Sequence, residues 1–206
     1  MTTTAETTDM QPLLAFARDH NACREARSWL TTQTDPHVAW ETCERPDWMI
    51  WFARRRSVER KVLVRIACDC ARTALRFVPE GEDRPRLAIE AAERWTRGEA
   101  TIDEVRVAAA DVAYAADTVA FAADAAANAA DAAANAAYAA DAAADAAADA
   151  AYAAANAAAD VAYAAYAAYA ADNADPGVAY ANACKQANIQ VCQIIRTHLR
   201  YEDVAL

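Results

Sequence analysis

The sequence predicts an all-α protein, an alanine-rich helical array or bundle with closely packed helices. Between Asp111 and Ala171, 39 of 61 residues are alanine, the residue with the strongest helix propensity. Neither glycine nor proline interrupts the chain between Gly98 and Pro176. Polar residues recur in that segment at spacings of three and four, which is the period of a helix and not of a strand.

Short helices with recognisable ends are predicted at the start of the chain. The spacing of apolar residues predicts one helix over 11–19 and a second over 22–30. Asp35 before Pro36 predicts an N-cap and a first helical residue, for a short helix that ends at Cys43.

Two longer helices are expected next. Pro46 predicts the start of the first, and Ser57 is expected to be the N-cap of the second. We expect Val78 and Pro79 to stop that second helix. Its apolar face recurs at helical spacing in Val58, Val62, Ile66, Cys70 and Ala74.

Three further signals delimit the rest of the chain. A helix that follows Pro85 is expected to end at Gly98 in a left-handed conformation. Thr101 with Glu104 predicts a capping box for the alanine-rich segment. Pro176 restarts a final helix, whose predicted core strip is Tyr180, Cys184, Val191, Ile194, Ile195 and Leu199.

This pattern divides the chain into three parts of one integrated domain. Residues 1–100 form a tryptophan-containing helical part, residues 101–175 an alanine-rich acidic segment, and residues 176–206 a C-terminal helix that completes the core. One unbroken helix over the alanine-rich segment would be too long for a compact chain. We therefore predict breaks near 138–141 and 163–172. The part that supplies most large core side chains contains Trp29, Trp40, Trp48 and Trp51.

Charge separates along the chain. Residues 1–100 contain sixteen Lys or Arg and sixteen Asp or Glu, whereas residues 101–206 contain four and fourteen, so the net charge of −10 belongs to the second half. An acidic chain argues against direct binding of nucleic acid. The one basic cluster is interpreted as a solvated face that pairs with the acidic half. It consists of Arg54, Arg55, Arg56, Arg60, Lys61 and Arg65.

No motif predicts catalysis, a cofactor or a metal. The chain lacks a glycine-rich phosphate loop and a Ser or Cys nucleophile motif with a nearby His. A redox or metal pair at Cys68 and Cys70 is disfavoured because residues two apart on a helix point to different faces, and Asp69 is interpreted as an exposed helix residue. We expect reduced, mostly buried cysteines in a cytoplasmic protein, without a secretory signal or membrane span.

Four stretches resemble a family of immunity proteins. They are CERPDW at 43–48, VPEGEDRP at 78–85, AIEAAE at 88–93 with Trp95, and RGEAT at 97–101. Members are alanine-rich helical proteins, similar to the fifth class of polymorphic-toxin immunity proteins and also found in phages. The resemblance covers residues 20–110 and implies a non-enzymatic protein that binds and neutralises a toxin. The alanine-rich segment departs from the family pattern because no arginine interrupts the alanines.

Polar residues of the alanine-rich segment form one stripe that supplies the candidate partner-binding residues. Aspartates at spacings of four and seven repeat about every 6 and 10.5 Å along a helix axis. Such a row fits the basic groove of a nuclease or another nucleic-acid enzyme, and tyrosines add rigid contact area with a polar tip. The candidates are Asp117, Asp124, Asp131, Tyr138, Asp141, Asp145, Asp149, Tyr152 and Asp160.

We therefore expect an immunity or antitoxin protein that neutralises a toxin with a basic surface through this acidic face. The alternative is a phage-type inhibitor of a restriction or CRISPR enzyme that imitates DNA with its aspartate stripe. A structural interpretation also stands, in which Asp and Asn keep an alanine helix soluble and the tyrosines anchor it to the core. A homodimer through the alanine faces is a further alternative, whereas ice binding is disfavoured because Thr118 is the only threonine between Thr101 and Thr197.

Overall fold

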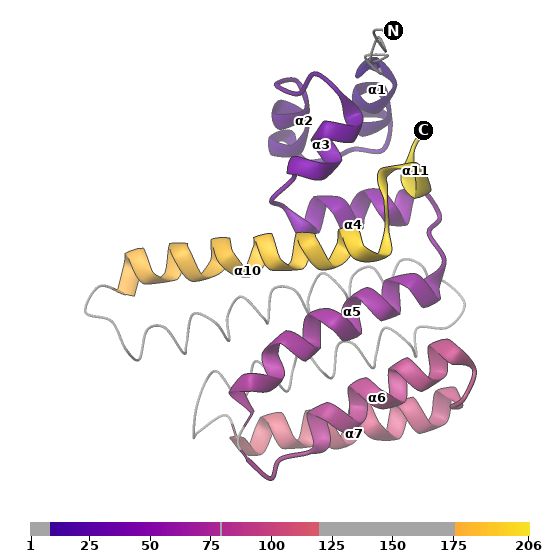
Figure 1. Cartoon of the computed structure of the whole chain (residues 1–206), viewed down its shortest axis with the longest axis vertical. Coiled ribbons are helices and arrows are strands. Elements are labelled where there is room, and N and C mark those ends of the chain that lie inside the picture. The colour runs from indigo at the N-terminus through magenta and orange to yellow at the C-terminus, as the bar shows by residue number, and fades with distance from the viewer. Residues whose placement is uncertain (1–8, 79, 120–175) are drawn as a thin grey trace, which may run out of the picture.

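The computed structural model describes residues 9–78, 80–119 and 176–206, and Figure 1 shows their arrangement. Every regular element in these residues is a helix, so the all-α prediction is confirmed. The two predicted breaks in the alanine-rich segment lie outside the described residues. None of the described helices combines the length and the hydropathy that a membrane crossing requires.

Three short helices open the fold, α1 (Gln11–Asp19), α2 (Arg24–Leu30) and α3 (Pro36–Thr42). The predicted cap of α3 is confirmed, because the Asp35 carboxylate accepts a hydrogen bond from the Val38 amide at 2.9 Å. Helix α2 begins two residues later than predicted. Asn21 adopts a positive φ of 56°, and the Cys23 sulfur accepts from the Ala26 amide at 3.4 Å and so caps the helix.

The next two helices are α4 (Pro46–Arg55) and α5 (Arg60–Ala74), and a 3-10 turn (Leu75–Phe77) extends α5. Pro46 begins α4 as predicted. The predicted cap at Ser57 is wrong. Ser57 lies at φ 58° and its amide donates to the Arg54 carbonyl at 3.0 Å, so it closes α4, and Glu59 precedes α5 without a side-chain cap.

Local signals define the following pair, α6 (Arg84–Arg97) and α7 (Ile102–Val119). Gly98 ends α6 at φ 79°, the left-handed conformation that glycine adopts without strain. The Thr101 amide donates to Glu104 Oε2 at 2.6 Å, and the Glu104 amide donates to Thr101 Oγ1 at 3.3 Å. These reciprocal bonds confirm the predicted capping box.

The helices stack in layers. Helix α10 (Pro176–His198) packs against α4 and α5, α6 packs on the other side of α5, and α7 covers α6 (Figure 1). The short C-terminal helix α11 (Tyr201–Val204) contacts α3. Six alanines of the described residues are fully buried between the helices, where small side chains permit close packing. They are Ala53, Ala67, Ala71, Ala88, Ala92 and Ala109.

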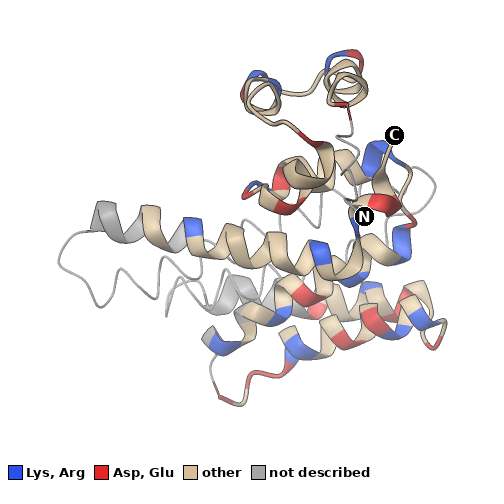
Figure 2. Ribbon diagram, turned by 45° about the horizontal axis from the view of Figure 1, so that its top comes forward, with Lys and Arg blue, Asp and Glu red and all other residues tan. Residues whose placement is uncertain are grey.

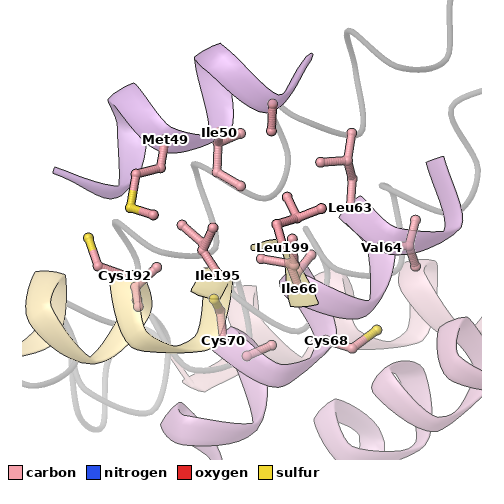
Figure 3. Packing of buried hydrophobic residues seen from close by; sticks show 14 of the residues in the cluster. Met49, Ile50, Leu63, Val64, Ile66, Cys68, Cys70, Cys192, Ile195 and Leu199 are labelled. Carbon is pink, nitrogen blue, oxygen red and sulfur yellow. The ribbon is translucent and has the colours of Figure 1, made fainter. Parts of the chain in front are cut away.

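Aliphatic side chains and methionine, not tryptophan, form the deepest core. Figure 3 shows α4, α5 and α10 contributing side chains that meet in one cluster. Trp40 is buried in that cluster, and the other four tryptophans are partly buried and pack against it. The largest fully buried side chains are Met49, Leu63, Ile66, Ile89 and Ile195.

Hydrogen bonds tie the C-terminal segment to the first half of the chain. Trp40 Nε1 donates to the Leu199 carbonyl at 3.2 Å. The Arg56 guanidinium donates to the carbonyls of Val204 at 3.0 Å and Ala205 at 2.6 Å. The buried cluster likewise joins residues from Met10 to Val204. The division of the chain into three parts stays a prediction.

Candidate partner-binding surface

The predicted acidic stripe falls almost wholly outside the described residues. Asp117 lies on α7, but its side chain is not described. The remaining candidates, all outside the described residues, are Asp124, Asp131, Tyr138, Asp141, Asp145, Asp149, Tyr152 and Asp160. Their role as a partner-binding surface stays a prediction.

Helix α7 begins the acidic half with exposed carboxylates. Asp103, Glu104 and Asp111 are exposed. Asp103 accepts a hydrogen bond from Arg106 at 2.9 Å. Hydrogen bonds from the Thr101 amide and hydroxyl lower the pKa of Glu104. The carboxylate of Glu104 is therefore ionised well below neutral pH, and the helix carries net negative charge.

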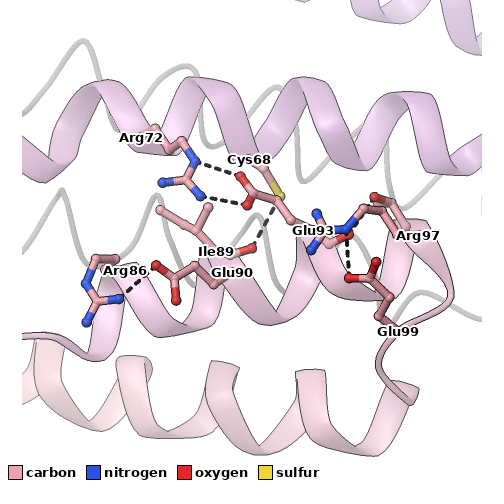
Figure 4. A network of polar contacts seen from close by, with 9 residues as sticks. Cys68, Arg72, Arg86, Ile89, Glu90, Glu93, Arg97 and Glu99 are labelled. Atoms are coloured by element: carbon pink, nitrogen blue, oxygen red, sulfur yellow. Dashed lines mark hydrogen bonds and ion pairs between the residues drawn. The ribbon is translucent and has the colours of Figure 1, made fainter.

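Several arginines of residues 1–100 form ion pairs with carboxylates in the same part of the chain. Figure 2 shows basic and acidic residues interleaved on α6, and Figure 4 shows the ion pair of Arg72 with Glu93, where two hydrogen bonds of 2.6 Å join α5 to α6. Further pairs within residues 1–100 are Arg45–Asp47, Arg84–Glu82, Arg86–Glu90 and Arg97–Glu99. In these contacts, arginines and carboxylates of residues 1–100 pair with each other.

The basic cluster around α4 and α5 makes aromatic and backbone contacts. The Arg55 guanidinium lies 5.8 Å from the centre of the Trp51 ring, and that of Arg60 lies 4.5 Å from the Trp95 ring. Arg56 binds the C-terminal carbonyls described above. For Arg55 and Arg56, the described residues therefore show stacking and backbone capping in place of the expected pairing with acids.

A groove lined by tryptophan opens where α2, the α3–α4 turn and α10 meet. We call it the tryptophan groove. It has a volume of ≈ 530 Å³, within the usual range of binding pockets. Its lining residues are Trp29, Thr42, Glu44, Arg45, Trp48, Ala181, Lys185 and Asn188.

Aromatic and charged contacts shape this groove. The rings of Trp29 and Trp48 lie 5.7 Å apart between centroids, and the Arg45 guanidinium lies 4.5 Å from the Trp48 centroid. Arg45 also donates two hydrogen bonds, of 2.9 and 2.7 Å, to Asp47. Lys185 Nζ lies 3.8 Å from a Glu44 oxygen. Trp29 and Trp48 therefore give the groove an aromatic surface. Arg45 and Lys185, which also line it, each lie next to a carboxylate.

Trp29 and Trp48 line both this groove and an apolar cavity. The cavity has a volume of ≈ 70 Å³ and is lined by side chains of α1 to α4, among them Phe16, Trp40 and Met49. Trp48 Nε1 is buried and has no hydrogen-bond partner in the described part of the chain. An unsatisfied buried donor costs about 1 to 3 kcal/mol. A change in the position of the Trp48 side chain that gives Nε1 a hydrogen-bond acceptor would recover this free energy.

Three buried cysteines are poor nucleophiles. Burial raises the pKa of the Cys68 and Cys70 thiols far above the ordinary value, and that of Cys192 to about 12, so these thiols stay protonated at neutral pH. Within the described ranges, no group of three or more His, Cys, Asp or Glu could hold a metal ion. Asp69 is half-buried and not exposed as expected, and its Oδ2 lies 2.7 Å from His198 Nε2.

Cysteine labelling checks this arrangement. At about pH 9, near the ordinary pKa of a free thiol, we expect iodoacetamide to modify the exposed Cys23 while Cys68, Cys70 and Cys192 stay unmodified in the folded protein. Peptide mass mapping reads out each position. The guanidinium-unfolded chain, in which all of them should react, is the control. Modification of Cys68 or Cys70 at the rate of Cys23 would contradict the described burial.

Comparison with known proteins gives no family or relative. No family model, no curated protein and no solved structure matches the chain. The resemblance to immunity proteins stays an expectation from sequence motifs.

Proposed function

We propose that this chain is a non-enzymatic, protein-binding inhibitor of the immunity or antitoxin type. It binds and neutralises a partner toxin, and the acidic segment after Arg106 meets a basic surface of that partner. The observation that carries the proposal is charge segregation: no Lys or Arg occurs between Arg106 and Lys185, whereas ten aspartates lie between Asp111 and Asp175. In the first half, by contrast, cations and acids are equal in number, and Arg72 forms an ion pair with Glu93.

Long-range attraction suits such an inhibitor. A surface of one charge sign raises the rate at which an oppositely charged partner associates, and added salt weakens that attraction. Enzymes that act on nucleic acid carry basic grooves for phosphate backbones. An acidic helical face that occupies such a groove excludes the substrate, so it inhibits without any catalytic group of its own.

The tryptophan groove is the second contact surface in this proposal. Trp and Arg are over-represented among the residues that dominate binding energy at protein interfaces. Trp29, Trp48 and Arg45 lie together there, with charged groups around them. Electrostatic attraction by the acidic segment would raise the association rate of the complex. Apolar burial at the groove would lengthen its residence time.

An anti-defence inhibitor that imitates DNA is the second candidate function. The same aspartate spacing favours it, because phosphates of a DNA strand also form a regular row of negative charge. The two functions predict different partners: a toxin for an immunity protein, and a restriction or CRISPR enzyme for an anti-defence inhibitor. The identity of the captured partner separates them.

Capture from the native host with a charge variant tests the proposal. The wild-type chain immobilised at low salt should retain one partner that a five-aspartate variant does not. The variant carries Asp124→Asn, Asp131→Asn, Asp141→Asn, Asp145→Asn and Asp149→Asn. Its helix content by circular dichroism should match the wild type, because Asn and Asp have similar helix propensities.

A control variant of equal charge makes the comparison specific. Five exposed acids outside the segment are neutralised instead, through Asp19→Asn, Glu25→Gln, Glu59→Gln, Glu80→Gln and Glu202→Gln. This control should retain the partner. Equal retention by the five-aspartate variant and the wild type would reject the acidic segment as the interface. If the five-aspartate variant retains the partner and Trp29→Ala does not, the interface lies at the tryptophan groove.

A further inference from the structure

A hollow between α1 and α2 gathers three arginines. It has a volume of ≈ 480 Å³, and Arg18 of α1 faces it together with Arg24 and Arg27 of α2. All three side chains are exposed. In the described part of the chain, none of them has a carboxylate within ion-pair distance. Glu25, the nearest acid along α2, lines the adjoining hollow and not this one.

This arrangement differs from that of arginines elsewhere in the fold. Arg45 and Arg72 each hold a carboxylate through two hydrogen bonds, and Arg196 holds backbone carbonyls. Three guanidinium groups around one hollow produce a local positive potential in a chain whose net charge is −10. That potential favours a small anion and has no counterpart in the proposed binding of a basic partner.

Several of these groups lie on one face of α2. Arg24, Arg27, Ser28 and Thr31 occupy positions i, i+3, i+4 and i+7, so they lie along one side of α2. Ala26, on another side of the helix, is buried. Thr31 donates its hydroxyl hydrogen to the Ser28 carbonyl at 2.7 Å. This leaves the Ser28 hydroxyl and the Gln11 side-chain amide of α1 as neutral donors beside the arginines.

We propose that this hollow binds the phosphoryl group of a small molecule, either free phosphate or a phosphate monoester. Guanidinium groups donate pairs of N–H bonds in a plane that matches phosphate oxygens. A tetrahedral dianion offers more acceptor oxygens than a carboxylate does, and three arginines from two helices line the hollow. The number of donors therefore favours phosphate over a carboxylate.

Calorimetric titration of the full chain tests this site. Inorganic phosphate and adenosine 5′-monophosphate are titrated at low ionic strength, with acetate and uncharged adenosine for comparison. Binding of the two phosphate ligands, without binding of acetate or adenosine at the same concentrations, is the expected result. Tighter binding of the nucleotide assigns the site to a phosphate monoester, and equal affinity assigns it to the free anion.

Two variants locate the binding. Arg24→Gln with Arg27→Gln should weaken phosphate binding about tenfold or more. Arg65→Gln, which removes an exposed arginine of α5, should leave it unchanged. Absence of binding by both phosphate ligands, acetate binding of equal strength, or equal weakening by Arg65→Gln would each overturn the proposal. Partner capture by the acidic segment is independent of these outcomes, because the double variant leaves every residue after Arg27 unchanged.

Discussion

Replacing Ile195 by alanine is expected to lower the free energy of unfolding by about 2 to 5 kcal/mol. Ile195 is fully buried and lies on α10, which packs against both α4 and α5. Figure 3 shows it near Cys192 and facing Met49 and Ile50 of α4. Truncation removes apolar burial and leaves a cavity that three helices cannot close without moving together.

Chemical denaturation of wild-type and variant protein measures this effect. Leu87→Ala is the matched control, because Leu87 lies on α6 with 49% of its surface exposed, and we expect a change within about 0.5 kcal/mol there. Equal, small changes for Ile195→Ala and Leu87→Ala would mean that α10 is not packed in the core.

The second large effect is expected at Arg196. Its guanidinium donates to the Trp40 carbonyl at 3.1 and 2.9 Å and to the Cys43 carbonyl at 2.5 Å, and its side chain is only 17% exposed. These carbonyls lie at the C-terminal end of α3, where a helix leaves its last acceptors without partners. Arg196 therefore supplies a cationic cap from a distant part of the chain.

Arg196→Met keeps an apolar stem but removes every donor, and it should destabilise the fold by about 2 to 4 kcal/mol. Arg65→Met is the control, because Arg65 is exposed on α5 and should change stability by less than about 0.5 kcal/mol. Thermal or urea unfolding monitored by tryptophan fluorescence compares the two. An Arg196→Met variant as stable as Arg65→Met would show that the cap contributes nothing.

Helix ends were predictable where the signal acts within one turn. The Asp35 cap, the left-handed Gly98 and the box of Thr101 with Glu104 all depend on atoms three or four residues apart, and the structure confirms them. Ser57 was predicted wrongly because serine also suits a link between helices. In the fold its amide donates to the Arg54 carbonyl and closes α4, with φ at 58°.

Sites built from distant segments were not predictable in the same way. Trp29, Trp48 and Lys185 come from three separate helices, so only the fold brings them to one groove. The density of tryptophan in residues 29–51 is the one sequence signal that could have indicated it. Basic residues are also dense in residues 54–65, so the sequence indicated a basic cluster there. Arg18 and the arginines of α2 are spread more thinly along the chain and were missed.

The central claim is that the acidic segment provides most of the electrostatic attraction for a basic partner. Its most direct test is the dissociation constant of the purified complex for the wild type and the five-aspartate variant, measured over a range of salt concentrations. If each lost carboxylate contributes about 0.5 kcal/mol, the variant should bind about 70-fold more weakly at low salt, with a smaller salt dependence than the wild type. Equal affinity and equal salt dependence for the two proteins would contradict the claim.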